Sequence, residues 1–218
     1  FRQGHEVCNE DICHLQKLGK NHLYLIDLAD DEIHENQAAA ILAQGLAGEG
    51  IRWEDDPKEG KIGLHAAMDG LLSVDAAALA AFNMVDEVMC ATLHSHTLAQ
   101  KGQLVAATRA IPLVMKRAPV ERAAAIAAQH GGVVSVKALK KAKVGLVVTG
   151  SEVFHGLIED KFAPILSGKV TDLGSEVAGV SFAPDDETLI TTAIRNHIDS
   201  GCDLLLLSGG MSVDPDDV

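Results

Sequence analysis

The sequence predicts an α/β fold: a three-layer, parallel-sheet domain in the last third of the chain, preceded by an α+β module. Three observations predict it. Short apolar segments that run into glycine occur at residues 143–150 and 202–210, as is typical of buried strands. Two segments with helical periodicity and a further strand-like segment lie between them. Strand and helix therefore alternate with short connections, and such βαβαβ units form parallel sheets covered on both faces.

The α+β module is placed at residues 1–141 because its helices and strands follow no regular alternation. Asn9 and Gly19 bound a first helix as N-cap and C-terminal glycine, and Pro119 and Gly131 bound the last one. Helices are predicted at 9–19, 30–48, 74–86 and 119–130, and strands at 22–28 and within 87–115, interrupted at 101–102. A lysine-rich stretch that ends near residue 143 joins this module to the second domain.

The second domain is placed at residues 142–218. Its strands are predicted at 143–150, 175–182 and 202–210, with a helix at 184–201 that carries acidic residues in its first turn. Another helix is predicted to end before Gly174, because apolar residues recur at steps of three and four: Ile158, Phe162, Ile165, Leu166, Val170 and Leu173. Leu204–Leu207 show no polar alternation, so we expect a central strand with both faces buried.

Composition argues against several classes of partner. The net charge of the 218 residues is −13 and the pI is about 5.1, and no large basic cluster occurs, so nucleic-acid binding is not expected. No run of about 18 uncharged apolar residues occurs, so no membrane partner is expected. Four scattered cysteines favour a cytoplasmic protein with reduced thiols. The chain begins with Phe1 and shows no basic, apolar leader, which favours a processed or trimmed chain over a secreted precursor.

Acidic residues follow all three predicted strands of the second domain, and in the first and third loops they stand beside glycine. The loops are 149–156, 183–186 and 208–218, and the carboxyl ends of parallel strands meet at one edge of a sheet, where ligands bind. Glycine lets backbone N–H groups approach a phosphate, and carboxylates can hold Mg²⁺ against it. The alternative is that Asp185 and Asp186 only cap a helix and that the last acidic residues form a solvated turn.

Three motifs carry a family resemblance. They are TG-x-E at 149–152, PDD at 184–186 and GG-x-S at 209–212, with Asp217 after the last one. Together they resemble the molybdopterin-binding domain of molybdenum cofactor biosynthesis proteins, which include adenylyltransferases and molybdenum insertases. The resemblance covers residues 143–218, and the whole chain most resembles the insertase-like proteins with a divergent N-terminal domain. Domains of that family continue beyond the acidic loop, so the domain here is expected to be incomplete.

The resemblance implies binding of molybdopterin or its adenylate, with Mg²⁺, and molybdate insertion as the reaction. The cofactor-binding residues it implies are Thr149, Gly150, Glu152, Ser208, Gly209, Gly210 and Ser212. The Mg²⁺ ligands it implies are Asp185, Asp186 and Asp217, of which Asp186 and Asp217 are the catalytic candidates. Two alternatives stay open: a non-catalytic carrier of the cofactor, and a nucleotide pyrophosphatase of the competence-damage-inducible type. Expected partners are a second copy of the chain and apo-molybdoenzymes.

Overall fold

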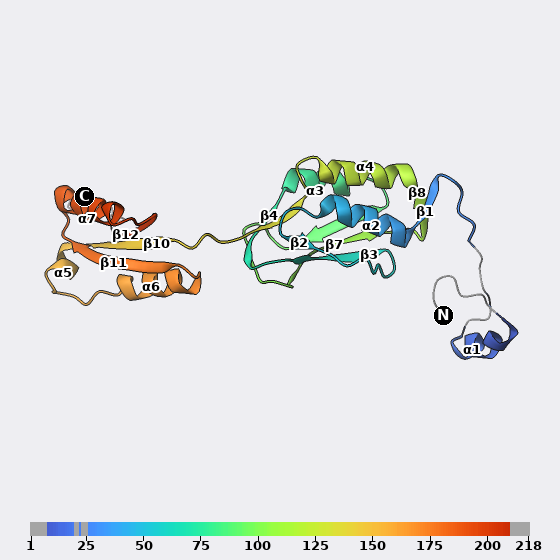
Figure 1. The fold of residues 1–218 in the computed structure, drawn as a ribbon, viewed down its shortest axis with the longest axis horizontal. Coiled ribbons are helices and arrows are strands. Elements are labelled where there is room, and N and C mark those ends of the chain that lie inside the picture. The colour runs from blue at the N-terminus through green and yellow to red at the C-terminus, as the bar shows by residue number, and fades with distance from the viewer. Residues whose placement is uncertain (1–7, 20–21, 23–25, 210–218) are drawn as a thin grey trace. The chain divides into compact units, whose positions relative to one another are not determined.

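A computed structural model describes residues 8–19, 22 and 26–209 (Figure 1). These residues fall into two compact units. The first contains the described residues up to 68 and residues 72–136; the second contains residues 69–71 and those from 137 onward. The predicted boundary between residues 141 and 142 lies in the irregular stretch 138–142, between the last strand of the first unit and the first strand of the parallel sheet.

The first unit is an α+β arrangement. Its helical elements are η1 (Asn9–Asp11), α1 (Ile12–Lys17), α2 (Glu35–Leu46), α3 (Ala76–Asn83) and α4 (Arg117–Ala128). Its strands are β1 (Glu32–His34), β2 (Ile51–Arg52), β3 (Lys61–Ala66), β4 (Gly70–Val74), β5 (Val88–Thr92), β6 (Leu98–Ala99), β7 (Leu104–Ala110), β8 (Val114–Lys116) and β9 (Val134–Lys137). They form sheets in the orders β2-β3-β7-β5, β6-β4-β9 and β1-β8.

The core of the first unit lies between its four-stranded antiparallel sheet and α2. Residues alternate along β3, so Ile62, Leu64 and Ala66 are buried while the residues between them are not. Helix α4 packs closely on α2: a Cβ at Gly45 would lie 2.7 Å from the Ala124 carbonyl oxygen. Glycine at position 45 therefore allows the two helices to approach each other at this point.

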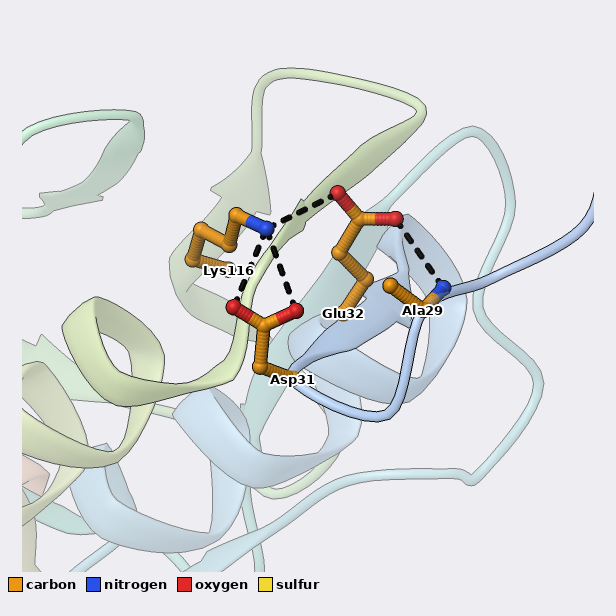
Figure 2. Close-up of polar contacts among 4 residues, drawn as sticks. All are labelled: Ala29, Asp31, Glu32 and Lys116. Carbon is orange, nitrogen blue, oxygen red and sulfur yellow. Dashed lines mark hydrogen bonds and ion pairs between the residues drawn. The ribbon is translucent and has the colours of Figure 1, made fainter.

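A surface network supports the two-stranded sheet β1-β8 (Figure 2). The Lys116 ammonium lies 3.0 Å from an Asp31 carboxylate oxygen and 3.1 Å from one of Glu32, and the other Glu32 oxygen accepts from the Ala29 N–H at 3.1 Å. Hydrogen bonds to Asp31 and Glu32 raise the pKa of Lys116, and the Ala29 N–H and then Lys116 lower the pKa of Glu32. The network holds the turn that leads into β1. Because all these groups are solvent-accessible, it contributes little to the free energy of folding.

The second unit is the predicted α/β domain. Its elements are β10 (Lys143–Thr149), α5 (Ser151–Phe154), α6 (Phe162–Asp172), β11 (Glu176–Ala183), α7 (Glu187–Asp199) and β12 (Leu204–Ser208). The strands are parallel, in the order β11-β10-β12. The α/β class, the parallel sheet and the βαβαβ order are thus confirmed.

The two long helices cover opposite faces of this sheet. Val144 and Leu146 of β10 pack with Val170 of α6 on one face. On the other face, a Cβ at Gly145 would lie 2.6 Å from the His197 ring of α7. Neighbouring residues of a strand point to opposite faces, so α6 and α7 sandwich the sheet in three layers.

The prediction for the four leucines was right about the parallel strand and wrong about its central place and its full burial. Leu204–Leu207 form parallel strand β12, but β10 is the central strand, and β12 pairs with β10 alone among the described residues. Leu204 and Leu207 are 43% and 49% exposed, whereas Leu146 of β10 is fully buried. The physical reason is that both helices pack over β10 and β11 and leave β12 partly uncovered. An apolar run identifies a strand but does not fix its place in the sheet.

Several boundaries also differ from the sequence-based predictions. Helix α6 begins at Phe162, so Ile158 lies in the loop before it, and the one-turn helix α5 and strand β9 were not predicted. The strand predicted at 22–28 is not formed at 26–28, and 23–25 lie outside the described residues. Helix α4 begins at Arg117, two residues before Pro119, which a first turn tolerates. No helix of the described part is long and apolar enough to cross a membrane.

Candidate functional site

The carboxyl ends of the three parallel strands meet at one edge, as predicted. Thr149 of β10 lies beside Ala183 of β11, and Val148 beside Ser208 of β12. Two hydrogen bonds fasten these ends: the Thr149 hydroxyl donates to the Ser208 carbonyl oxygen at 2.5 Å, and the Gly150 N–H donates to the Ala183 carbonyl oxygen at 3.1 Å. The loops that leave the three strands therefore start from a shared, fixed edge.

Ser151 and Asp185 form the most direct link between two of these loops. One Asp185 oxygen accepts from both the Ser151 backbone N–H and the Ser151 hydroxyl, each at 2.8 Å. The Ser151 hydroxyl is also 3.3 Å from the Asp185 backbone N–H. Sequence reasoning missed Ser151, although a serine that follows TG at the start of a helix was a usable signal. The link ties the start of α5 to the loop after β11.

Asp186 has a different partner from Asp185. Its side chain accepts from the Leu189 N–H at 2.9 Å and caps α7. The capping alternative raised from the sequence therefore applies to Asp186, while Asp185 accepts hydrogen bonds from Ser151 in the loop after β10. In each carboxylate, the second oxygen accepts no hydrogen bond from the described residues. Oxygen atoms are the ligands that Mg²⁺ takes, but no three acidic, histidine or cysteine side chains in the described part gather where they could hold a metal ion.

The glycines allow a close approach to this edge. Gly150 and Gly209 have φ of +134° and +107°, a region that side chains disfavour. A Cβ at Gly209 would collide with the Thr149 hydroxyl, so glycine is also needed for the hydrogen bond between β10 and β12. Glu152 lies on α5 and is exposed, and its side chain has no polar partner among the described residues.

Ser208 is the most unusual polar residue of the edge. Its side chain is 9% exposed, and its hydroxyl oxygen has no hydrogen-bond partner in the described part of the chain. Buried hydroxyl groups in folded proteins are nearly always paired, with protein, water or ligand. The Ser208 hydroxyl therefore marks the end of β12 as a place where a polar partner is to be expected. The other residues predicted for this loop, Gly210, Ser212 and Asp217, lie outside the described residues.

An apolar cavity adjoins the first of these loops. It has a volume of about 580 Å³ and is lined by Val153, Ile158, Glu159, Lys161 and Phe162. Asp160, between two of these lining residues in sequence, accepts from the Phe162 N–H at 2.8 Å. Ile158 was predicted to pack on the core from a helix face, but it lies before α6 and is 58% exposed, so it lines the cavity instead.

Comparisons with known proteins match the second unit. Residues 145–218 match the family model described as "Probable molybdopterin binding domain", and residues 1–27 match a domain of unknown function, DUF8806. CinA-like proteins of Mycolicibacterium gilvum and Mycobacterium tuberculosis are 35% and 32% identical to this chain over 77 residues. The matched part is 35% of this chain and only 18% of either relative.

Two solved structures are also similar. The tungsten cofactor synthesizing protein MoaB from Pyrococcus furiosus is 28% identical, with a TM-score of 0.35 over 37% of this chain and 49% of that one. A molybdopterin biosynthesis protein from Mycobacterium abscessus is 27% identical, with a TM-score of 0.34 over 35% and 48% of the two chains. The family model covers the strand, helix and loop sequence that builds the edge described above. Residues 145–218 of the chain thus carry a domain of the molybdopterin-binding family.

Proposed function

We propose that the second unit binds molybdopterin or its adenylate and acts in molybdenum cofactor biosynthesis. The observation that carries the proposal is the shared edge: the loops after β10, β11 and β12 are fastened by Thr149 and Ser151 around glycines with positive φ. Such an edge presents backbone N–H groups and leaves room for a phosphate. The family match over residues 145–218 supports molybdopterin as the class of ligand.

The chain's own residues have separate tasks in this proposal. Gly150 and Gly209 let the ligand approach the backbone, and the Ser208 hydroxyl donates a hydrogen bond to it. Thr149 acts through Ser208, because it holds the Ser208 carbonyl and not the ligand. Glu152, Gly210 and Ser212 belong to the same proposed set, on the strength of the motifs.

Molybdate insertion is the finer proposal. Mg²⁺ would be held by Asp185, Asp186 and Asp217, with waters completing its coordination, and it would neutralise charge on the phosphates. Asp186 → Asn tests it well. An asparagine still caps α7, so the fold is kept while the charge is removed. An insertase should then lose roughly 10²-fold or more in turnover, with a much smaller change in affinity.

Two alternatives are favoured by specific observations. A non-catalytic carrier fits the same edge, because binding needs only the glycines and hydroxyls. A pyrophosphatase of the competence-damage-inducible type is favoured by the CinA-like relatives, although here the domain follows about 140 other residues. The chain spans less than a fifth of those relatives, so their activity as whole proteins remains a proposal for this one. Association with a second copy and with apo-molybdoenzymes likewise stays a prediction.

One set of measurements tests the proposal and separates its alternatives. Calorimetry should show binding of molybdopterin or its adenylate by the full chain, weakened in Gly209 → Val, whose side chain would block the approach to the backbone. Turnover of adenylated molybdopterin with molybdate identifies an insertase, and binding without turnover identifies a carrier. Cleavage of a pyridine-nucleotide pyrophosphate, without affinity for molybdopterin, would reject the proposal in favour of the pyrophosphatase alternative.

A further inference from the structure

The four-stranded sheet of the first unit has one face without a covering helix. Figure 1 shows α2, α3 and α4 on one side of β3 and β7, and no described helix of this unit packs on the other side. The uncovered side chains follow from the alternation of buried and exposed positions. We call them the open sheet face: Arg52 of β2, Lys61, Gly63 and His65 of β3, Leu104, Ala107 and Arg109 of β7, and Met89 and Ala91 of β5.

The charge of this face differs from that of the chain. The protein has 31 acidic and 18 basic residues, yet the four strands contain Arg52, Lys61, Arg109 and His65 and no Asp or Glu. Between these groups the face is flat, since Gly63, Ala107 and Ala91 lie side by side on neighbouring strands. The face therefore offers positive charge around a shallow surface of small residues.

Arg109 is held in place without a polar partner. It lies directly opposite Lys61 on one neighbouring strand and Met89 on the other. Its Nε is buried, and no described residue accepts a hydrogen bond from its side chain. A guanidinium that is positioned by packing and left unpaired has donors to offer to an anion.

A cavity of about 430 Å³ opens on the same face, and Lys61, the register partner of Arg109, is one of its lining residues. Arg52, Lys61 and His65 line it around Gly63. The His65 ring and the end of the Leu104 side chain lie over Gly63, within 3.1 Å and 2.8 Å of where its Cβ would be, and form one wall. Side chains directly opposite each other on neighbouring strands lie within about 5.5 Å at Cβ, so Arg109 reaches a group bound next to Lys61.

Acidic residues of the loop 53–60 restrict the choice of ligand. Glu54 and Asp56 also line the cavity. Lys58 lies 3.6 Å from Asp56 and Lys61 lies 3.3 Å from Glu59, so those four charges largely offset one another. Of the basic residues on the open sheet face, Arg52 and Arg109 have no acidic partner among the described residues, and His65 is a further donor.

We propose that the open sheet face binds a small molecule through its phosphate group, at Arg52, Lys61, His65 and Arg109. A phosphate dianion matches several cations at once, and the planar guanidinium donates two parallel hydrogen bonds to it. The rest of the ligand lies on Ala91, Ala107 and the apolar surface of Met89 and Leu104, which are 46% and 52% exposed. The net charge of −13 disfavours a nucleic acid as the occupant. This site is independent of the function proposed for the second unit.

Tryptophan fluorescence of the full chain tests the proposal. Trp53 is the single tryptophan and stands between Arg52 and Glu54, both of which line the cavity. The probes are phenyl phosphate, phenol and inorganic phosphate. We expect a saturable change with phenyl phosphate, a weaker one with phosphate and none with phenol, and weaker binding at higher salt.

Variants decide which residues are responsible. Arg109 → Ala and Arg52 → Ala should each weaken phenyl phosphate binding roughly tenfold, because each loses a charge-assisted hydrogen bond. Arg109 → Lys should keep only part of the affinity that Arg109 → Ala loses, since lysine keeps the positive charge but lacks the planar guanidinium. Glu54 → Gln should tighten binding by removing repulsion. Arg122 → Ala, the same change on the exposed surface of α4, is the matched control and should bind as the parent does.

Three results would overturn the proposal. The first is no response of Trp53 to phenyl phosphate. The second is equal affinity in Arg109 → Ala and Arg122 → Ala. The third is tighter competition by a polyglutamate peptide than by phenyl phosphate, which would make the face a surface for acidic peptides. Gly209 → Val should leave the fluorescence response to phenyl phosphate unchanged. The test of the open sheet face can therefore fail or succeed independently of the molybdopterin experiment.

Discussion

Replacing Ser208 by alanine should separate folding from ligand binding. The Ser208 side chain is 9% exposed and its hydroxyl has no partner among the described residues. A buried polar group without a hydrogen bond costs about 1–3 kcal/mol. Ser208 → Ala removes that group and little volume. We therefore expect the free energy of unfolding to rise by roughly 1 kcal/mol in the ligand-free protein, or at least not to fall.

Ligand binding should respond in the opposite direction. If the hydroxyl donates to a phosphate, its loss removes a hydrogen bond worth about 0.5–1.5 kcal/mol, which is roughly a two- to tenfold loss in affinity. Urea denaturation gives the stability, with an unchanged slope showing that the folded state is kept. Calorimetry with molybdopterin gives the affinity.

Thr149 → Val is the matched comparison. Its hydroxyl is paired with the Ser208 carbonyl oxygen, so its removal leaves an acceptor without its donor and should destabilise the second unit by about 1 kcal/mol. The reasoning is refuted if Ser208 → Ala destabilises the protein as much as Thr149 → Val does. It is also refuted if Ser208 → Ala binds molybdopterin as tightly as the parent.

Three further outcomes are expected from the described contacts. Gly209 → Ala should destabilise the second unit by about 1–2 kcal/mol or more, measured by urea denaturation, because its φ is +107° and the new Cβ would meet Thr149. Gly145 → Ala should cost about 1–3 kcal/mol by overpacking on the His197 ring, and a double-mutant cycle with His197 → Ala should show that the two changes are not additive. Burial raises the pKa of the Cys90 thiol from 9.0 to about 12, so the folded state binds more protons than the unfolded state in that window. Stability should therefore fall as pH rises from 9 towards 12, and Cys90 → Ala should flatten the fall; an unchanged pH profile would contradict this assignment.

The parallel-sheet unit was predictable because its signals are local. The β-branched run at 143–150 predicted the buried strand β10, and Gly174, with φ of +74°, ended the helix before β11 where the sequence predicted. The place of β12 in the sheet was not predictable, since Leu204–Leu207 look the same at an edge as in the centre. Strand order depends on which elements the helices cover, and that is a property of packing and not of any one segment.

The candidate site was predicted by residue type and only partly by role. Acidic residues after each strand, with glycine after the first and third, indicated one edge of the sheet, but an aspartate in a PDD motif can cap a helix, hold a loop or bind a metal ion. The structure assigns two of these roles to different residues: Asp186 caps helix α7, and Asp185 holds the loop at Ser151. Hydrogen-bond partners determine that division, and the partner of Asp185 lies 34 residues away in sequence.

His197 is a buried polar residue whose place is explained by packing and one hydrogen bond. Sequence reasoning did not single it out, yet it is 8% exposed, and its Nε2 lies 3.0 Å from the Ser181 hydroxyl. Its ring lies over Gly145 and Gly179, so two strands lack side chains where the imidazole packs. Gly145 and Gly179 are register partners on β10 and β11, and this pair of glycines lets α7 approach the sheet. Because Asp186 caps the N-terminus of the same helix, the packing of His197 on the sheet also helps to place that carboxylate at the shared strand edge.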